Sequence, residues 1–120
     1  MSYKTLVIGA SLKEERYSNK AIKRLRSFQH PVIAIGLREG KVLDVKIEKG
    51  KPDFKEVHTV TMYINPSRQP GYYDYIISLQ PKRVIFNPGT ENPEFYSILK
   101  NKNIHFEESC TLVLLSTNQF

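Results

Sequence analysis

The sequence predicts a doubly wound α/β fold, in which a parallel sheet lies between two layers of helices. Short unbroken apolar segments, such as Val32-Ile33-Ala34-Ile35, are typical of strands that are buried on both faces. These segments alternate with stretches of helical periodicity, and small or polar residues follow each apolar segment. We therefore expect about five parallel strands in a three-layer α/β/α arrangement.

The first strand is predicted at residues 4–8, where an apolar run leads into Gly9-Ala10-Ser11. A helix follows, and Ser18 is its predicted N-cap, because a serine hydroxyl can accept a hydrogen bond from a free N–H group of the first turn. Its apolar stripe consists of Ala21, Ile22, Leu25 and Phe28 at helical spacing. Pro31 prevents this helix from continuing, and the second strand is predicted at residues 32–35.

Residues 37–53 interrupt the alternation of strands and helices. Val42, Val45 and Ile47 stand there among glycines and charged residues, so we predict a short extra strand or hairpin near residues 41–47.

The alternation resumes in the second half of the chain. Further strands are predicted at residues 59–64, 83–86 and 104–107, and a helix at residues 70–79. Asn92 is the predicted cap of another helix, with Pro93 in its first turn. The inward face of that helix is predicted to consist of Phe95, Ile98 and Leu99. The periodicity of residues 111–115 is ambiguous, and we favour a short closing helix.

The length and composition of the chain limit the classes of protein to which it can belong. A chain of 120 residues predicts one domain over residues 1–120. The net charge of +6 favours an anionic partner, but no zinc-finger, helix-turn-helix or RNA-binding motif is present, so we do not expect nucleic-acid binding. The single cysteine, Cys110, favours a reducing cytoplasm. No apolar run approaches the roughly 18 residues that cross a membrane.

The end of the first strand predicts a phosphate-binding turn. At Gly9-Ala10-Ser11, backbone N–H groups and the start of a helix both point to the carboxyl edge of the sheet. The dinucleotide fingerprint is absent, and Arg38 stands where NAD binding needs a carboxylate. A cation there suits a phosphorylated ribose, as in NADP or coenzyme A (CoA).

Other residues near the predicted strand ends are candidates for the same ligand. The loop of residues 10–17 brings Ser11, Lys13, Arg16 and Ser18 within reach of a diphosphate. Two interpretations stay open for these positions: Gly9 serves either phosphate binding or close packing of strand and helix, and the cations serve either the ligand or the solvated surface.

The sequence also resembles a known family. Gly9-Ala10-Ser11, the stretch from Asn87 to Pro93 and the closing residues 110–117 resemble the small stand-alone CoA-binding proteins, which are similar to the CoA-binding domain of the succinyl-CoA synthetase α subunit. The resemblance implies a Rossmann-like fold that holds the ADP portion of CoA. By the same resemblance, Gly9, Ala10 and Ser11 would meet the diphosphate and Arg38 the 3′-phosphate. The crevice would be flanked by Asn65, Pro66, Arg68, Pro88, Gly89 and Thr90.

The sequence does not predict catalytic machinery. His30, His58 and His105 are scattered, and none lies at a predicted carboxyl edge or forms a metal-ligand pattern. Cys110 is either a small buried apolar residue or a thiol that reacts with CoA. We therefore expect a non-catalytic binding or regulatory module for CoA or an acyl-CoA, with a second copy or a partner enzyme as further partners. The alternative is an NADP- or acyl-CoA-dependent enzyme subunit that lacks its partner domain.

Overall fold

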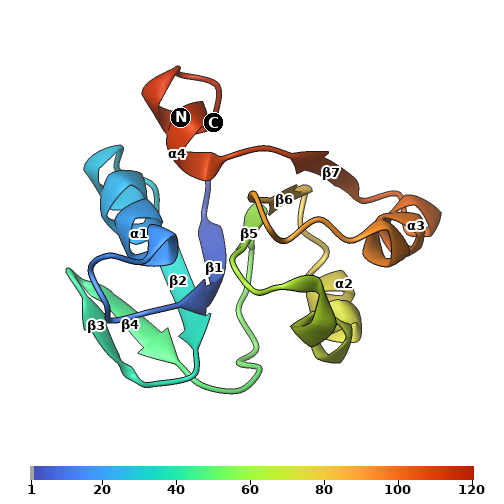
Figure 1. Cartoon of the computed structure of the whole chain (residues 1–120), viewed down its shortest axis with the longest axis horizontal. Helices are drawn as coiled ribbons and strands as arrows, with labels where there is room; N and C mark the ends of the chain where they lie inside the picture. Colours follow the sequence, from blue (N-terminus) through green and yellow to red (C-terminus); the bar gives the residue numbers. More distant parts are fainter. Residues whose placement is uncertain (1) are drawn as a thin grey trace.

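A single seven-stranded sheet forms the centre of the molecule (Figure 1). The computed structural model describes residues 2–120, so residue 1 of the predicted domain lies outside the described residues. The strands are β1 (Thr5–Ala10), β2 (Val32–Gly36), β3 (Gly40–Val42), β4 (Val45–Glu48), β5 (Thr59–Met62), β6 (Arg83–Phe86) and β7 (His105–Glu108). The helices are α1 (Tyr17–Ser27), α2 (Tyr73–Leu79), α3 (Pro93–Asn101) and α4 (Thr111–Ser116), with short 3-10 turns η1 (Pro66–Arg68) and η2 (Pro70–Tyr72).

The strand order is β3-β4-β2-β1-β5-β6-β7, and only β3 runs antiparallel to its neighbour. This confirms the predicted Rossmann-like α/β class. The sheet is wider than the predicted five strands, because the expected hairpin joins it. Strand β4 pairs in parallel with β2, with Ala34 opposite Ile47, and β3 adds the antiparallel edge.

The side chains of β1 alternate between two cores, as expected for a strand that is covered on both faces. Leu6 and Ile8 pack in the cluster that includes Phe95 of α3, while Val7 packs with Ile22 of α1 and other residues on the opposite face. The helices therefore cover both faces of the sheet, and Figure 1 shows α1 on one side and α2 and α3 on the other.

Several predicted boundaries were wrong for local physical reasons. Arg16, rather than Ser18, is the N-cap of α1, and Ser18 is buried within the first turn. Phe28 lies beyond the helix and is 39% exposed, so it does not extend the apolar stripe. The predicted helix at residues 70–79 begins as the 3-10 turn η2, in which the Tyr72 N–H bonds to the Gln69 carbonyl. Strand β1 continues to Ala10.

Strand β5 ends at Met62 rather than at residue 64, because a side chain replaces the sheet partner. The Asn87 side-chain amide donates to the Met62 carbonyl at 2.8 Å, so this carbonyl no longer continues the ladder.

The predictions for the two closing helices are confirmed. Asn92 caps α3, and its side-chain oxygen accepts from the Phe95 N–H at 3.3 Å. Residues 111–116 form helix α4, with Thr111 and Leu115 buried. Among the described residues, no helix has the length and apolar character needed to cross a membrane.

Candidate functional site

A cavity of about 670 Å³ lies at the carboxyl edge of the sheet, where β1, β2, β5 and β6 end. It is lined by residues 9–13, 16–18, 35–38, 63–65 and 88–90, together with Arg68 and Tyr72. Carboxyl ends of parallel strands are the usual ligand position in such folds, because the crossover loops separate there. The cavity therefore stands where the sequence predicted a site.

Most of the predicted site residues meet around this cavity. Those that line it are Gly9, Ala10, Ser11, Arg16, Ser18, Arg38, Asn65, Arg68, Pro88, Gly89 and Thr90. Pro66 is the exception: it is exposed, lies outside the lining, and begins the turn η1. Of residues 65–68, which include η1, Asn65 and Arg68 line the cavity.

Gly9 has a structural reason of its own for lacking a side chain. Its φ of +96° lies in the left-handed region that favours glycine, and the pairing of β1 with β2 shifts register between Ile8 and Ala10. A Cβ atom at this position would lie 2.8 Å from the carbonyl carbon of Tyr63. Gly9 therefore lets the end of β1 approach the backbone that follows β5, and residues 63–65 of that backbone segment line the cavity.

The charges around the cavity have one sign. Lys13, Arg16, Arg38 and Arg68 line it and are exposed, and no aspartate or glutamate is among the lining residues. None of the four ion pairs found among residues 2–120 involves one of these cations. The cavity is therefore suited to an anionic ligand, with cations that are not engaged by acidic side chains of the protein.

A buried pair of amide side chains holds two walls of the cavity together. Gln69 donates from Nε2 to the carbonyls of Ile64, at 3.0 Å, and Thr90, at 2.8 Å. Asn92 in turn donates to Gln69 Oε1 at 2.9 Å. The loops after β5 and β6 are thus joined by side-chain bonds. Sequence reasoning missed Gln69, since nothing in its local pattern shows that a residue 21 positions away is its partner.

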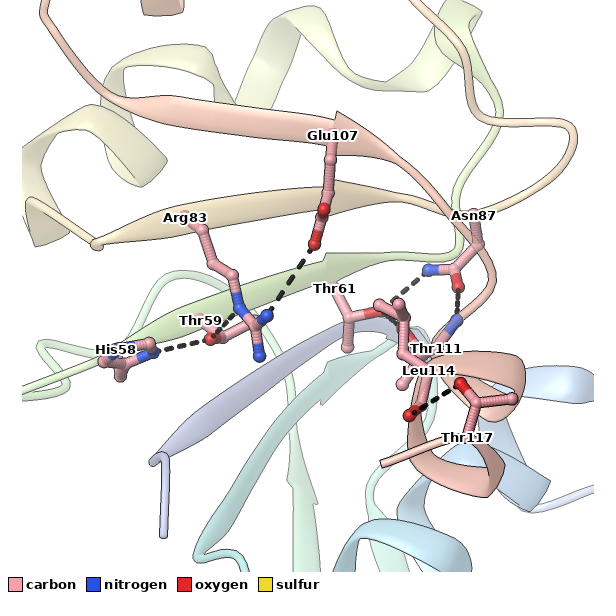
Figure 2. Close-up of polar contacts among 9 residues, drawn as sticks. All are labelled: His58, Thr59, Thr61, Arg83, Asn87, Glu107, Thr111, Leu114 and Thr117. Carbon is pink, nitrogen blue, oxygen red and sulfur yellow. Dashed lines mark hydrogen bonds and ion pairs between the residues drawn. The ribbon is translucent and has the colours of Figure 1, made fainter. Parts of the chain in front are cut away.

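Asn87 ties the same region to helix α4 (Figure 2). Its Nδ2 donates to Thr61 Oγ1 at 2.7 Å, and its Oδ1 accepts from the Thr111 N–H at 2.9 Å. Its backbone carbonyl accepts from the Thr90 hydroxyl at 2.8 Å. Asn87 therefore fixes the start of the loop that carries Pro88, Gly89 and Thr90. The sequence signals for it were its place directly after a strand and its position at the start of the stretch that carries the family resemblance.

Two backbone N–H groups of loop residues that line the cavity form hydrogen bonds within their own loops. The Gly89 N–H donates to Glu91 Oε1 at 2.9 Å, and the Lys13 N–H donates to Ser11 Oγ at 3.1 Å.

Tyr63 also lines the cavity, and burial raises the pKa of its hydroxyl well above the ordinary value. Tyr63 is therefore a neutral hydrogen-bonding group at physiological pH.

Histidine and cysteine side chains are not part of this arrangement. His30, His58, His105 and Cys110 do not line the cavity. Cys110 is half-buried at the N-cap of α4. Within residues 2–120, no group of three or more histidine, cysteine, aspartate or glutamate side chains could hold a metal ion.

The comparison with family models decides the identity of this chain. The model described as "CoA binding domain" matches residues 3–116, which is nearly the whole chain. The chain belongs to this CoA-binding domain family. Among curated proteins, no match was found.

Solved structures similar to this CoA-binding domain support the fold. A crystal structure described as an uncharacterized protein shares 47% sequence identity, has a TM-score of 0.97, and aligns over 100% of this chain and 99% of its own. A Thermus thermophilus protein, cell-free ID.343, shares 20% identity with a TM-score of 0.87 over 99% of this chain and 91% of its own.

A third structure extends the same comparison. A hypothetical protein from Pyrococcus horikoshii OT3 shares 22% identity with a TM-score of 0.88, over 97% of this chain and 83% of its own. At such identities, this structure and the Thermus structure support the fold alone.

Proposed function

We propose that this domain binds CoA or an acyl-CoA in the cavity at the carboxyl edge and acts as a non-catalytic binding or regulatory module. The observation that carries the proposal is the set of four exposed cations, Lys13, Arg16, Arg38 and Arg68, in a lining without a carboxylate. CoA carries a diphosphate and a 3′-phosphate, so its charges complement this lining. The family match supports a ligand of the CoA type.

The proposed orientation follows the resemblance together with the geometry. The diphosphate lies against the turn of Gly9, Ala10 and Ser11, close to the start of α1, where free N–H groups favour anions. Arg38 lies at the end of β2 and takes the 3′-phosphate, since a guanidinium can bind a phosphate with two parallel hydrogen bonds. The loops after β5 and β6 form the opposite wall.

The composition of the lining favours binding over catalysis. General acid–base chemistry needs a titratable group near neutral pH, and the lining contains no histidine, cysteine or carboxylate. The rival proposal is an NADP- or acyl-CoA-dependent enzyme subunit whose partner supplies the catalytic groups. NADP also carries a phosphorylated ribose, which suits Arg38 equally well.

Calorimetric titration with CoA, dephospho-CoA and NADP separates these proposals. We expect the protein to bind CoA about tenfold more tightly than dephospho-CoA, which corresponds to about 1.4 kcal/mol. Arg38→Gln removes this preference. The matched control, Arg24→Gln, removes an exposed arginine of α1 outside the cavity and keeps the preference.

The outcomes that contradict the proposal are distinct. Absence of binding by all three nucleotides would exclude the cavity as a nucleotide site. Tighter binding of NADP than of CoA would favour the enzyme subunit instead. An unchanged preference for CoA in Arg38→Gln would place the 3′-phosphate elsewhere.

Native mass spectrometry of the purified protein tests which ligand is retained and whether the protein assembles with a further chain. We propose the cytoplasm as the compartment because of the single cysteine, and a second copy or a partner enzyme as a further partner. A mass increase equal to CoA or an acyl-CoA would identify the ligand directly, and a doubled or larger mass would identify the assembly. A bare single chain would argue against both a retained ligand and a stable assembly.

A further inference from the structure

A cluster of aromatic and cationic side chains lies at the amino edge of the sheet, opposite the cavity. We call this the amino-edge cluster, and it consists of Tyr3, His30, His58, Arg83 and Phe120. These residues are far apart in the sequence, and they bring together the segments that carry the N and C marks in Figure 1. The cluster is separate from the proposed CoA site, because none of its members lines that cavity.

Stacked rings form the body of this cluster. The Tyr3 ring centre lies 4.1 Å from that of His58 and 5.9 Å from that of His30. The Phe120 ring centre lies 4.9 Å from that of His30. Arg83 Cζ lies 4.3 Å from the centre of the Phe120 ring, within the range of a cation–π interaction. Phe120 thus contacts His30 and Arg83, and it also packs near the Tyr3 ring and against the apolar core on the α1 side of the sheet.

A backbone hydrogen bond fixes the protonation state of His30 in this arrangement. The Tyr3 N–H donates to His30 Nδ1 at 2.9 Å. A backbone N–H group is only a donor, so Nδ1 must present its lone pair and the ring must be neutral. A proton on Nδ1 would remove this bond and set two N–H groups against each other. His30 is only 6% exposed, so water cannot readily replace the lost bond.

The positive charge of Arg83, which faces His30, also opposes protonation of this histidine. Arg83 lies across the cluster and is offset only loosely by Glu107, whose carboxylate is 3.7 Å from Arg83 Nη1 (Figure 2). Arg83 Nη2 is buried and has no hydrogen-bond partner within residues 2–120. On the α1 side, Arg26 donates to the His30 carbonyl and is itself paired with Asp44.

His58, directly before β5, lies in a similar environment. Its Nδ1 lies 2.7 Å from Thr59 Oγ1, and that oxygen accepts from Arg83 Nε at 2.8 Å. Burial, followed by the charge of Arg83, lowers the pKa of both histidines. Smaller contributions to this lowering come from the amino terminus and His58 at His30, and from Lys82 at His58.

We propose that the amino-edge cluster is an acid-sensitive attachment: protonation of His30 releases the Tyr3 segment and residues 117–120, including Phe120, from the sheet. The direction of the pH dependence follows from the linkage between proton binding and release of the segment. A histidine whose pKa is lower in the folded state binds more protons when it is released, so the attachment is complete above the ordinary value of 6.5 and is lost as the pH falls below it.

The test is a backbone NMR measurement on the whole chain at about pH 7.5 and about pH 5.0, on either side of the histidine range. We expect the ¹⁵N heteronuclear NOE values of residues 117–120 to fall at the lower pH in the wild-type protein. In His30→Asn, the amide oxygen keeps an acceptor for the Tyr3 N–H but does not titrate, so these residues stay ordered. His105→Asn is the matched control: it removes an exposed histidine outside the cluster and behaves as the wild type.

Two results would overturn this proposal. One is a wild-type protein in which residues 117–120 remain ordered at the lower pH, and the other is a His30→Asn variant that loses their order as the wild type does. If this variant does not fold, the measurement on the wild-type protein tests the proposal by itself. The NOE change must then follow the titration of the His30 ring, and a different midpoint would refute the mechanism.

Discussion

At the carboxyl edge of the sheet, Arg16, Arg38 and Arg68 are exposed and take part in none of the ion pairs found among residues 2–120. At the amino edge, the side chain of Arg83 is only 14% exposed and is held by the Phe120 ring and the Thr59 hydroxyl. The arginines of the carboxyl edge are available to the proposed ligand, whereas Arg83 serves internal packing. The role of each arginine therefore depends on the residues that surround its guanidinium group. The net charge of the chain does not distinguish the two roles.

The largest effect is expected at the backbone turn that shapes the carboxyl edge. Gly9→Ala places a methyl group 2.8 Å from the Tyr63 carbonyl carbon and forces a side chain into a left-handed conformation. We expect a loss of about 2–4 kcal/mol in the free energy of unfolding, measured in urea.

Gly71→Ala is the matched control for this variant. A Cβ atom at Gly71 would have no heavy atom within 4 Å, so we expect no loss of stability there. Equal stabilities of the two variants would show that the close approach of β1 to residue 63 is not required.

A smaller effect is expected at the amino edge. Phe120→Ala removes the ring from Arg83 and His30, and we expect it to cost about 1 kcal/mol of unfolding free energy. The affinity for CoA should stay the same, because Phe120 does not line the cavity. Denaturation and calorimetry on one preparation measure both quantities.

The exposed Val113→Ala change serves as the control for that variant, with little effect on either quantity. The comparison between the two edges would fail if Phe120→Ala weakened CoA binding as much as Arg38→Gln does, since stability and binding would then depend on the same residues.

The smallest effect is expected at Glu91. Its carboxylate accepts from the Gly89 N–H at 2.9 Å beside the cavity, where its charge would oppose the proposed anionic ligand. Glu91→Gln should bind CoA about twofold more tightly, as expected for removal of one exposed charge. Glu56→Gln removes an exposed carboxylate outside the cavity and corrects for the change in net charge. Weaker binding by Glu91→Gln would mean that this carboxylate supports the loop.

Local patterns were sufficient to predict most elements and the edge that carries the cavity. Apolar runs such as residues 32–35 predicted strands, and the Asn92-Pro93 pair predicted the start of α3. The boundary at Ser18 was wrong, because a serine can stand within the first turn as well as before it. Local patterns also did not reveal that Pro66, unlike Asn65 and Arg68, lies outside the lining of the cavity.

The amino-acid sequence by itself determined the α/β class, the alternation of strands and helices, and the small and cationic residues that stand at the strand ends. Tertiary structure alone decided that Gln69 bonds to Thr90, that Asn87 bonds to Thr111, and that His30 meets Phe120. The physical reason is distance along the chain: periodicity and capping act over a few residues, whereas these contacts form only after parallel crossovers have brought remote segments to one edge of the sheet.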